Sequence, residues 1–463
     1  MSIGAVVMAA GQGTRMKSAV PKVLHEIAGR PLVGWVLDAL AGVRVTNTVV
    51  VVGHGAEAVK AVLPAQAKVA LQREQHGTGH ATQIGLRALD RSCDTVIVLS
   101  GDTPLLERDL LKRLVRSHTR SGRAATLVSA ILDDAGRYGR VVRDGSNVRI
   151  VEARDASATE LAIQEINAGL YIFDRAKLER ALRRVGRDNA QGEVYLPDVL
   201  PLVGGDIGVL VSQNPDVVLG VNSRVELAEC GAIIQERLRG RLLVAGVAMP
   251  DPTAVYLDAD VVVEADAVLH PGTHLQGTTS IGPGCVIGPN VVANNCVIGA
   301  GTTALFAHMS DSVIGAGCQI GPFAYLRPGV TVEDGGKIGT YVEVKNSRVG
   351  KKAKVPHLSY IGDADIGDGT NIGAGNITAN YDGFRKHRTT IGVGVKTGSD
   401  CVFVAPVSIG DRAMTAAGSI LTHDVPAGAL GIARARQENL EGFTERAEAK
   451  ARAAMKRDGK RSR

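Results

Sequence analysis

Two stretches of the sequence carry side chains whose types and spacing could do chemistry on phosphate and acyl groups. In the first, MAAGQGTRMKSAVPK (residues 8–22), a glycine loop directly follows a predicted strand and is flanked by Arg15 and Lys22. Backbone N–H groups of such a loop can face an anion at a helix start. It is not a Walker loop, because the GK[ST] ending is missing. Tight turns need glycine without any ligand, so the two cations carry the prediction of a triphosphate site.

A carboxylate follows the third predicted strand. Asp102 stands after a hydrophobic run and a glycine in LSGDTPLL (residues 99–106). The carboxyl ends of strands are where open α/β sheets bind ligands, and a carboxylate there could hold a divalent cation. It could equally cap the following helix. The residues alone leave both interpretations open.

The second stretch is VPHLSYIGDADIGDGTNIGAGNITANYDG (residues 355–383), which contains His357. Attack of an amine on a thioester needs a base whose pKa lies near neutral pH, and histidine is the usual choice. A single histidine on a regular surface is also often just a surface residue. His357 is therefore a candidate base whose role depends on its surroundings.

Alternating strands and helices must position the first centre. This alternation runs to about Asn222 and indicates a mostly parallel sheet covered by helices, a Rossmann-like α/β domain over residues 1–222. A capping-box pattern of Ser223 and Glu226 then predicts a linker helix over residues 223–247. The clearest predicted strands are Ile3–Met8, Thr48–Val52, Thr95–Leu99 and Ala125–Ile131.

A repeat of six residues must position the second centre. It predicts a parallel β-helix over residues 248–437, because six residues per flat side stack the aliphatic side chains into an internal column. A β-sandwich would alternate with period two instead. The series breaks after His357 and at the polar segment 379–390, where we expect the chemistry. Its members are Ile314, Ile320, Leu326, Val332, Ile338 and Val344, then Ile391, Thr397, Phe403, Ile409 and Thr415.

Composition narrows the class of protein. The chain has 463 residues, and no run approaches the roughly 20 apolar residues of a membrane helix. The first residues lack a basic signal-peptide region, and six scattered cysteines without a CxxC pair are typical of reduced thiols, so we expect a cytoplasmic protein without a zinc cluster. The net charge of +6 comes with only 3% aromatic residues, which argues against a nucleic-acid partner. Residues 438–463 read as a charged, solvated helix or tail.

Further strings match a known family in order. The GxGTRM loop followed by PK resembles the signature of sugar-phosphate nucleotidyltransferases. With LQREQHGTGHA (71–81), LSGDTPLL (99–106), INAGLYIF (166–173), NAQGEVYLPD (189–198) and VNSR (221–224), it resembles the uridylyltransferase half of the bifunctional N-acetylglucosamine-1-phosphate uridylyltransferase and glucosamine-1-phosphate acetyltransferase family. The motif around His357 resembles the acetyltransferase half. The resemblance extends to about Arg436 and implies left-handed coiling of the β-helix.

The resemblance implies a first set of functional residues. Glucosamine-1-phosphate would be acetylated from acetyl-CoA, and its product coupled to UTP with Mg²⁺. Arg15 and Lys22 would stabilise the triphosphate and the departing pyrophosphate, while Asp102 and Asn222 would bind the magnesium ion. The remaining predicted contacts of the uridylyl site are Ala9, Ala10, Gly11, Gly13, Gln72, Gly77, Thr78, Ser100, Gly101, Gly139, Glu152 and Asn167. Ser100 stands where some relatives have tyrosine, which leaves its own contact open.

The resemblance implies a second set around the base His357. The sugar phosphate would be bound by Arg327, Lys345, Tyr360, Asn371 and Lys386. Acetyl-CoA would be bound by Ala374, Asn380, Tyr381, Ser399, Ala417 and Arg434. Glycine and alanine also suit tight β-helix corners, so each small residue has a structural explanation too. Relatives assemble as trimers whose neighbouring subunits complete the acetyl site, and we expect a homotrimer without a nucleic-acid or membrane partner.

Two other classes of protein predict different residues. A monofunctional nucleotidyltransferase with a structural β-helix predicts no base at the interrupted coils, where His357 stands with Tyr360, Asn380 and Tyr381. A regulatory binding module of the translation-factor kind commonly loses the cations of the glycine loop. Here Arg15, Lys22 and Asp102 are all present, which favours an enzyme with two sites.

Overall fold

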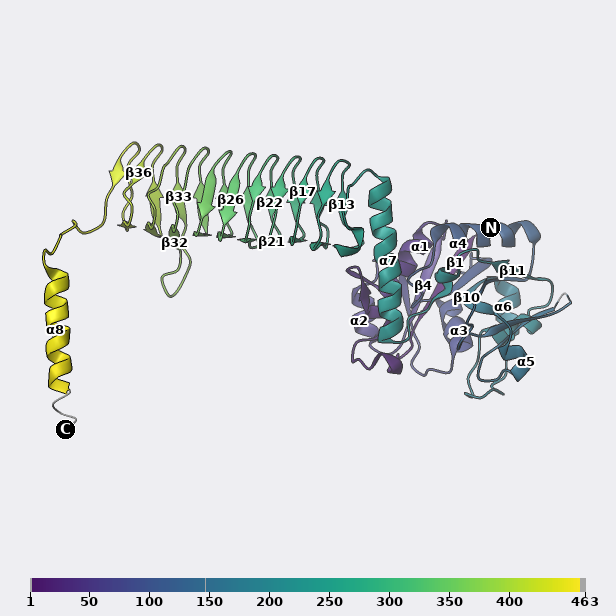
Figure 1. Ribbon diagram of the computed structural model, residues 1–463. Coiled ribbons are helices and arrows are strands. Elements are labelled where there is room, and N and C mark those ends of the chain that lie inside the picture. The colour runs from purple at the N-terminus through teal and green to yellow at the C-terminus, as the bar shows by residue number, and fades with distance from the viewer. Residues whose placement is uncertain (1, 146, 459–463) are drawn as a thin grey trace. The chain divides into compact units, whose positions relative to one another are not determined.

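The computed structural model describes residues 2–145 and 147–458. The chain divides into two compact units, Met1–Ser280 and Ile281–Arg463, which are considered separately below (Figure 1). Because the division falls within the hexapeptide region, the domain limits at residues 222, 247 and 437 remain a prediction. The last part of the predicted tail, residues 459–463, lies outside the described residues.

A mixed sheet forms the centre of the first unit, with strand order β11-β7-β10-β6-β1-β4-β5. Strand β1 is parallel to β4 and β6, whereas β10 runs antiparallel to β6 and β7. The predicted, mostly parallel α/β sheet is confirmed. Its strands are β1 (Ile3–Ala9), β4 (Asn47–Val52), β5 (Lys68–Leu71), β6 (Thr95–Ser100), β7 (Ala125–Ile131), β10 (Glu165–Asp174) and β11 (Ile207–Val211), with β8 (Arg140–Asp144) and β9 (Asn147–Val151) paired beside β10.

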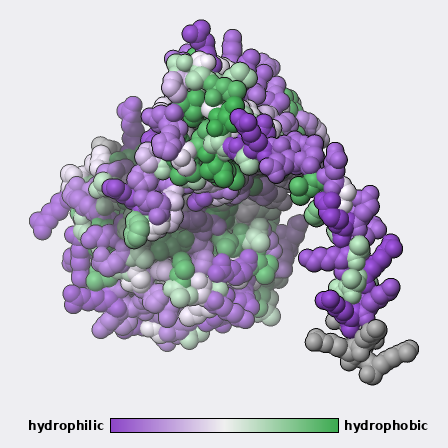
Figure 2. All heavy atoms as spheres, turned by 90° about the vertical axis from the view of Figure 1, so that its left-hand side faces the viewer, coloured by the Kyte–Doolittle hydropathy of each residue, from purple (hydrophilic) through white to green (hydrophobic). Residues whose placement is uncertain are grey.

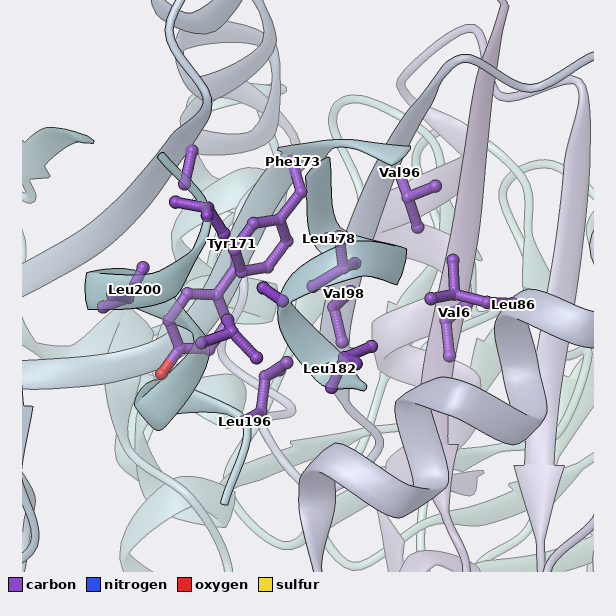
Figure 3. Packing of buried hydrophobic residues seen from close by; sticks show 14 of the residues in the cluster. Val6, Leu86, Val96, Val98, Tyr171, Phe173, Leu178, Leu182, Leu196 and Leu200 are labelled. Atoms are coloured by element: carbon purple, nitrogen blue, oxygen red, sulfur yellow. The ribbon is translucent and has the colours of Figure 1, made fainter. Parts of the chain in front are cut away.

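Both faces of this sheet are buried, because successive side chains of a strand point to opposite sides. Val6 of β1 belongs to one hydrophobic cluster and its neighbour Val7 to another. Figure 3 shows the first cluster, where Tyr171 and Phe173 pack with leucines of neighbouring helices. The helices of the unit are α1 (Leu32–Ala41), α2 (Ala56–Ala61), α3 (Thr78–Ala88), α4 (Arg108–Ser121), α5 (Ala158–Leu161), α6 (Arg175–Leu182) and α7 (Arg224–Val244).

The predicted linker helix is α7, and Ser223 caps it by accepting a hydrogen bond from the Glu226 N–H. The Glu226 carboxylate accepts the backbone N–H of Asn222 at 2.7 Å, one residue earlier than a capping box predicts. The start of the helix therefore also fixes the backbone at Asn222. Short strands follow within this unit and at its boundary: β12 (Val255–Leu257), β13 (Val262–Val263), β14 (Val268–Leu269), β15 (Thr273–Gln276) and β16 (Ser280–Ile281).

Three parallel sheets close the second unit into a prism, and we name them faces A, B and C. Face A holds β18 (Val292–Asn294), β21 (Ala307–Ser310), β24 (Ala324–Leu326), β27 (Glu343–Lys345), β30 (Tyr360–Gly362), β32 (Ile377–Ala379), β34 (Val402–Val404) and β37 (Ile420–Leu421). Face B holds β19 (Val297–Ile298), β22 (Val313–Ile314), β25 (Thr331–Val332), β28 (Arg348–Val349), β31 (Ala364–Ile366), β33 (Thr389–Ile391) and β35 (Val407–Ile409). Face C holds β17 (Val286–Ile287), β20 (Thr303–Ala304), β23 (Gln319–Ile320), β26 (Lys337–Thr340) and β29 (Lys354–His357). The chain visits the faces in the order C, A, B.

The six-residue period is the step from one face to the next. Ile314 lies on face B, Ile320 on face C and Leu326 on face A, and all three side chains are buried. The predicted internal column of aliphatic residues is therefore confirmed. The polar segment 379–390 leaves the prism as a loop between β32 and β33, visible below β32 in Figure 1.

The second unit ends in β36 (Met414–Thr415), β38 (Leu430–Gly431) and α8 (Phe443–Asp458). The side chains of α8 are mostly hydrophilic and exposed, as predicted for a solvated helix (Figure 2). All six cysteine side chains are buried. Within residues 2–145 and 147–458, no helix has the length and apolar content needed to cross a membrane.

Candidate active sites

Four of the predicted uridylyl-site residues meet at the carboxyl end of the first sheet. The Lys22 ammonium forms an ion pair with the Asp102 carboxylate and lies 3.1 Å from Oδ1 of Asn222. Arg15 donates to the same Asn222 oxygen at 3.0 Å. Residues far apart in the sequence therefore place two cations and two oxygen ligands at one point, and Asp102 is part of this cluster instead of serving as a helix cap.

The Asp102 carboxylate is held ionised although its side chain is only 14% exposed. Burial opposes ionisation, but the Lys22 ammonium and hydrogen bonds from Lys22 and Ser100 outweigh it and lower the pKa of Asp102. The Ser100 hydroxyl donates to Oδ1 at 2.6 Å. Ser100, whose contact the sequence left open, thus orients the predicted metal ligand.

The donor set around Lys22 fits a hard divalent cation. Oxygens of Asp102 and Asn222 already converge on one positive charge, the Lys22 ammonium. Mg²⁺ commonly takes one or two protein oxygens and completes its shell with water and substrate phosphate. Among the described residues, no group of three or more His, Cys, Asp or Glu side chains could hold a metal, which is compatible with so sparse a site.

The glycine loop borders a cavity of about 300 Å³. Gly13 has a positive φ of 64°, and a Cβ there would come within 2.6 Å of the Lys22 Cβ, so glycine is required for this close approach. Gly101 donates its N–H to the carbonyl of Met8, which lines the cavity. The predicted residues that line the cavity are Ala9, Ala10, Gly11, Lys22, Gln72, Gly77, Thr78, Ser100 and Asp102.

Buried polar contacts fix the far side of this cavity. The Gln72 amide donates to the Gly77 carbonyl at 3.4 Å and lies 3.1 Å from Nδ1 of His80. Thr78 accepts the N–H of Leu196, which ties the start of α3 to the NAQGEVYLPD segment. Sequence reasoning missed Gln75, whose amide donates to the Ala10 carbonyl at 2.7 Å and lines the cavity.

The three residues predicted to bind the sugar form a second group in the first unit. The Asn167 N–H donates to the Gly139 carbonyl at 2.8 Å, and a Cβ at Gly139 would lie 3.3 Å from the Glu152 carboxylate. Burial raises the pKa of Glu152, helped by the nearby Asp198 and Asp155. A partly desolvated carboxyl of this kind suits hydrogen bonding with sugar hydroxyls.

In the second unit, His357 shares a row with residues predicted to bind acetyl-CoA. His357 pairs with Thr340 at the corner between faces C and A. The bridges Lys354–Asn371, Asn371–Lys396 and Lys396–Met414 fix the register of the following coils. His357 stands three residues after Lys354. Ala374, Ser399 and Ala417 stand three residues after the other bridged residues, so they continue the row of His357. Asn371 lies in the bridged row instead.

Apart from Asn371, the residues predicted to bind the sugar phosphate gather at another corner, between faces A and B. Arg327 and Lys345 occupy equivalent positions on adjacent coils, and Lys386 comes from the loop that leaves this corner. The nearby Lys345 lowers the pKa of Lys386, as expected for two ammonium groups that lie close together. A phosphate would relieve the repulsion between them. Arg327 is paired with Glu343 at 3.0 Å.

Sequence reasoning missed two residues at this corner, Gly362 and Asp363. The Asp363 carboxylate accepts from the amides of Asn346 and Asn380 and lies 3.7 Å from the Lys345 ammonium. Burial opposes its ionisation, but these partners lower the pKa of Asp363. The Tyr360 hydroxyl and the Asn380 amide fill the space above Gly362.

Tyr381 and Arg434 are the two predicted residues that lie outside these groups. Tyr381 bridges to Lys386 within the protruding loop, and its hydroxyl donates to the Gly383 carbonyl. Arg434 follows β38 and is exposed. Neither position contributes to the row that contains His357 within one chain.

Comparison with known proteins agrees with this division. A model of the MobA-like NTP transferase domain matches residues 5–170, and a model of the bacterial transferase hexapeptide (six repeats) matches residues 260–293 and 311–346. Proteins named bifunctional protein GlmU are similar along nearly the whole chain. That of Streptomyces avermitilis is 49% identical over 95% of this chain and 94% of its own length. Those of Streptomyces coelicolor and Brevibacillus brevis are 48% and 47% identical, over 98% and 94% of this chain and 97% and 96% of their own lengths.

The chain belongs to the bifunctional GlmU family. It is an enzyme that combines a nucleotidyltransferase domain with a hexapeptide transferase domain, and the prism is the left-handed parallel β-helix expected of such repeats. Nucleotide and acetyl-CoA are the substrates of the two halves in this family. Each unit contains its own set of the predicted site residues described above.

Replacement of Gly362 by alanine tests the second site of this GlmU-family chain. The new Cβ would come within 2.4 Å of the Tyr360 hydroxyl and 2.7 Å of the Asn380 amide, so both must shift. Since displacements near 1 Å can cost about 100-fold, we expect kcat/KM of acetylation to fall roughly 10- to 100-fold. Steady-state rates with glucosamine-1-phosphate and acetyl-CoA measure it.

The matched control for this substitution is Gly240→Ala, in helix α7, where the added Cβ meets no atom within 4 Å apart from the adjoining backbone of its own helix. It should leave acetylation unchanged, and uridylyl transfer should be normal in both variants. A wild-type acetylation rate for Gly362→Ala would show that Tyr360 and Asn380 are not needed in their present positions.

Asp363→Asn tests the lowered pKa at the same corner. Asn tolerates the positive φ of 52° at this residue, so the change removes mainly charge and an acceptor. Because the folded pKa lies below the unfolded one, ionised Asp363 stabilises the fold above pH ~4, and this contribution is lost as the pH falls through the folded pKa. We expect the variant to lose about 2 kcal/mol at neutral pH.

Calorimetric melting of wild type and Asp363→Asn across pH measures this effect. The difference in Tm should be large at pH ~7 and should shrink below pH ~4. Asp311→Asn is the control, because Asp311 also has a positive φ but is exposed. A difference that stays the same from neutral to acidic pH would contradict the assignment.

Proposed function

We propose that the two sites act in sequence on one sugar phosphate. The β-helix site acetylates glucosamine-1-phosphate, and the α/β site then transfers a uridylyl group from UTP to the product. UDP-N-acetylglucosamine and pyrophosphate are released. The observation that carries this proposal is that each unit of a GlmU-family chain contains its own cluster of chemically suitable residues.

In the acetyl site, the nitrogen of the sugar amine attacks the thioester carbon, and His357 takes a proton from this amine. The C–N bond forms, the C–S bond breaks, and CoA leaves as the thiol after protonation. Arg327, Lys345 and Lys386 hold the phosphate through charge-assisted hydrogen bonds. Tyr360 and Asn371 complete the contacts with the sugar phosphate. Acetyl-CoA lies along Ala374, Ser399 and Ala417, where small side chains allow close approach to the backbone, and Asn380, Tyr381 and Arg434 complete its contacts. The register of the His357 row supports this arrangement.

In the uridylyl site, a phosphate oxygen of the sugar attacks the α-phosphorus of UTP, and the bond to pyrophosphate breaks. Lys22 and Arg15 neutralise the charge on the triphosphate and on the leaving group. Gln72, Gly77 and Thr78 hold the uridine, and Gly139, Glu152 and Asn167 hold the sugar. Asp102 and Asn222 would bind Mg²⁺, which when bound neutralises phosphate charge and helps to align the reactants.

We further propose that the chain acts as a homotrimer in the cytoplasm. Within one chain, His357 lies at the corner of faces C and A, while Arg327 and Lys345 lie at the corner of faces A and B. A neighbouring copy could bring the two corners together. Beside His357, exposed apolar side chains form a row. In this row the rings of Phe323 and Tyr341 stack, with their centroids 5.2 Å apart. Sedimentation equilibrium should give three times the chain mass, and a stable monomer with full acetylation would refute this.

An omission assay tests the proposed function. Purified protein is incubated with glucosamine-1-phosphate, acetyl-CoA, UTP and Mg²⁺, and each is left out in turn. We expect UDP-N-acetylglucosamine only in the complete mixture, and N-acetylglucosamine-1-phosphate when UTP or Mg²⁺ is missing. Sugar nucleotide formed without acetyl-CoA, or no acetylated product at all, would overturn the proposal.

A further inference from the structure

The inner side of the corner that carries His357 changes character along the β-helix. The inward-facing residues that immediately precede or begin the strands of face A form one buried column. In chain order the column reads Val291, Ala307, Ala324, Val342, Ser359, Asn376, Cys401 and Ser419, all buried. The polar residues of this column begin with Ser359, on the coil of His357. They continue on the coils that carry Ala374, Ser399 and Ala417.

Asn376 is the largest polar residue of this column, and its side chain is completely buried. Its amide nitrogen donates to the Gly373 carbonyl at 2.6 Å and to the Gly398 carbonyl at 2.9 Å, on the next coil. These carbonyls directly precede Ala374 and Ser399 in the chain. One amide group therefore joins two neighbouring segments of the proposed acetyl-CoA row.

A second contact connects Asn376 to the proposed base. The Asn376 N–H donates to the Ser359 hydroxyl at 3.2 Å, and that hydroxyl donates to the His357 carbonyl at 2.7 Å. Both side chains are nearly or fully buried. The backbone of His357 is thus linked through Ser359 and Asn376 to the backbone of the next two coils.

The hydrogen bond from Ser359 to the His357 carbonyl is, by itself, of a kind that recurs in this β-helix. Ser312 and Ser347 also donate to the carbonyl two residues earlier, at another corner. Asn376 differs, because no donor among the described residues reaches its buried Oδ1. An unsatisfied buried acceptor costs free energy that an apolar side chain would not incur. The Asn376 amide is therefore poorly explained by stability alone.

We propose that Asn376, together with Ser359, is a positioning residue of the acetyl-transfer site. It holds the carbonyls of Gly373 and Gly398 at a fixed separation and thereby aligns the acetyl-CoA row with His357. This inference rests on the proposed acetyltransferase function. The positioning role applies to acetyl-CoA and not to the sugar phosphate, because the cations proposed to bind the phosphate, Arg327 and Lys345, lie at the other corner.

Asn376→Leu tests the proposal by replacing the amide with an apolar group of similar volume. We expect the KM for acetyl-CoA to rise about tenfold and kcat/KM to fall as much as about 100-fold, as for a misaligned substrate. The KM for glucosamine-1-phosphate should stay unchanged. A general structural defect would raise both KM values together, and equal increases, or wild-type values for both, would overturn the proposal.

The matched control is Thr302→Val. The Thr302 hydroxyl is equally buried, donates to the Gly315 carbonyl at 2.8 Å and accepts the Cys318 N–H at 3.0 Å, on coils that precede His357. Its loss should change neither KM. If Asn376→Leu does not fold, the milder Ser359→Ala decides: a selective rise in the KM for acetyl-CoA supports the proposal, and wild-type values overturn it.

Failure of this inference is distinguishable from failure of the proposed function. A wild-type chain that does not acetylate glucosamine-1-phosphate refutes the function. In that case calorimetric titration of the full chain with acetyl-CoA still decides the inference. Weaker binding by Asn376→Leu than by Thr302→Val supports a positioning role, and equal binding refutes it.

Discussion

Replacing His357 by alanine is expected to lower kcat for acetylation by about 10²- to 10⁴-fold. The amine of glucosamine is largely protonated at neutral pH and must lose a proton during attack. The acetyl-CoA contacts lie mainly on later coils, so the KM for acetyl-CoA should change little. This is the pattern of an interaction made only in the transition state. Thiol release from acetyl-CoA measures the rate.

The pH profile adds a second criterion for His357. Wild-type acetylation should decline in acid, as expected for a reaction assisted by a general base, and the variant should lack that decline. His423→Ala is the matched control, since His423 is another exposed histidine of the same unit outside the His357 row. A His357→Ala chain with the wild-type rate and profile would make His357 a surface residue.

Asp102→Ala is expected to lower uridylyl transfer by about 10³-fold or more, because a bound cation contributes several kcal/mol to a transition state of this kind. The variant also leaves Lys22 without its ion-pair partner. Acetylation takes place in the other unit and should remain normal. Pyrophosphate release with saturating N-acetylglucosamine-1-phosphate measures the effect.

Two variants make the test of Asp102 specific. Asp102→Asn keeps an oxygen but loses the charge, so it should need more Mg²⁺ for half-maximal rate. Asp109→Ala removes an exposed carboxylate that pairs with Lys112 on α4, and it should behave as wild type. Undiminished uridylyl transfer by Asp102→Ala would remove this residue from the metal site.

The architecture was largely predictable because it depends on local periodicity. Six residues advance the chain by one face, so Ile314, Ile320 and Leu326 had to share the interior. The strands around the glycine loop were equally visible as short apolar runs. Both signals come from the regular spacing of buried side chains along a single segment.

The contacts within the sites were less predictable, because they depend on which coils and loops are neighbours. Coils of the β-helix differ in length, so no fixed spacing in the sequence places Gly362 beside Lys345 or Asn376 beside Gly398. Likewise, Glu226 reaches the N–H of Asn222 instead of that of Ser223, which depends on the path of the preceding loop. Knowledge of which residues pair between neighbouring coils would have identified Gly362 and Asp363.

The roles of individual residues came from the resemblance to the family, and the geometry supports some more than others. Lys22, Asp102 and Asn222 lie in direct contact, which gives their proposed roles a physical basis. Arg434 is exposed and contacts none of the other proposed residues by a hydrogen bond or ion pair among those described. Its role in acetyl-CoA binding therefore remains a prediction from the resemblance.

Mixing the two inactive variants tests most directly whether the chain contains two independent sites that act in sequence. His357→Ala and Asp102→Ala should each fail to convert glucosamine-1-phosphate to UDP-N-acetylglucosamine when acetyl-CoA, UTP and Mg²⁺ are present. An equal mixture should restore the conversion, because N-acetylglucosamine-1-phosphate made by one variant can be used by the other. A mixture that stays inactive, while each variant retains its own partial activity, would contradict this account.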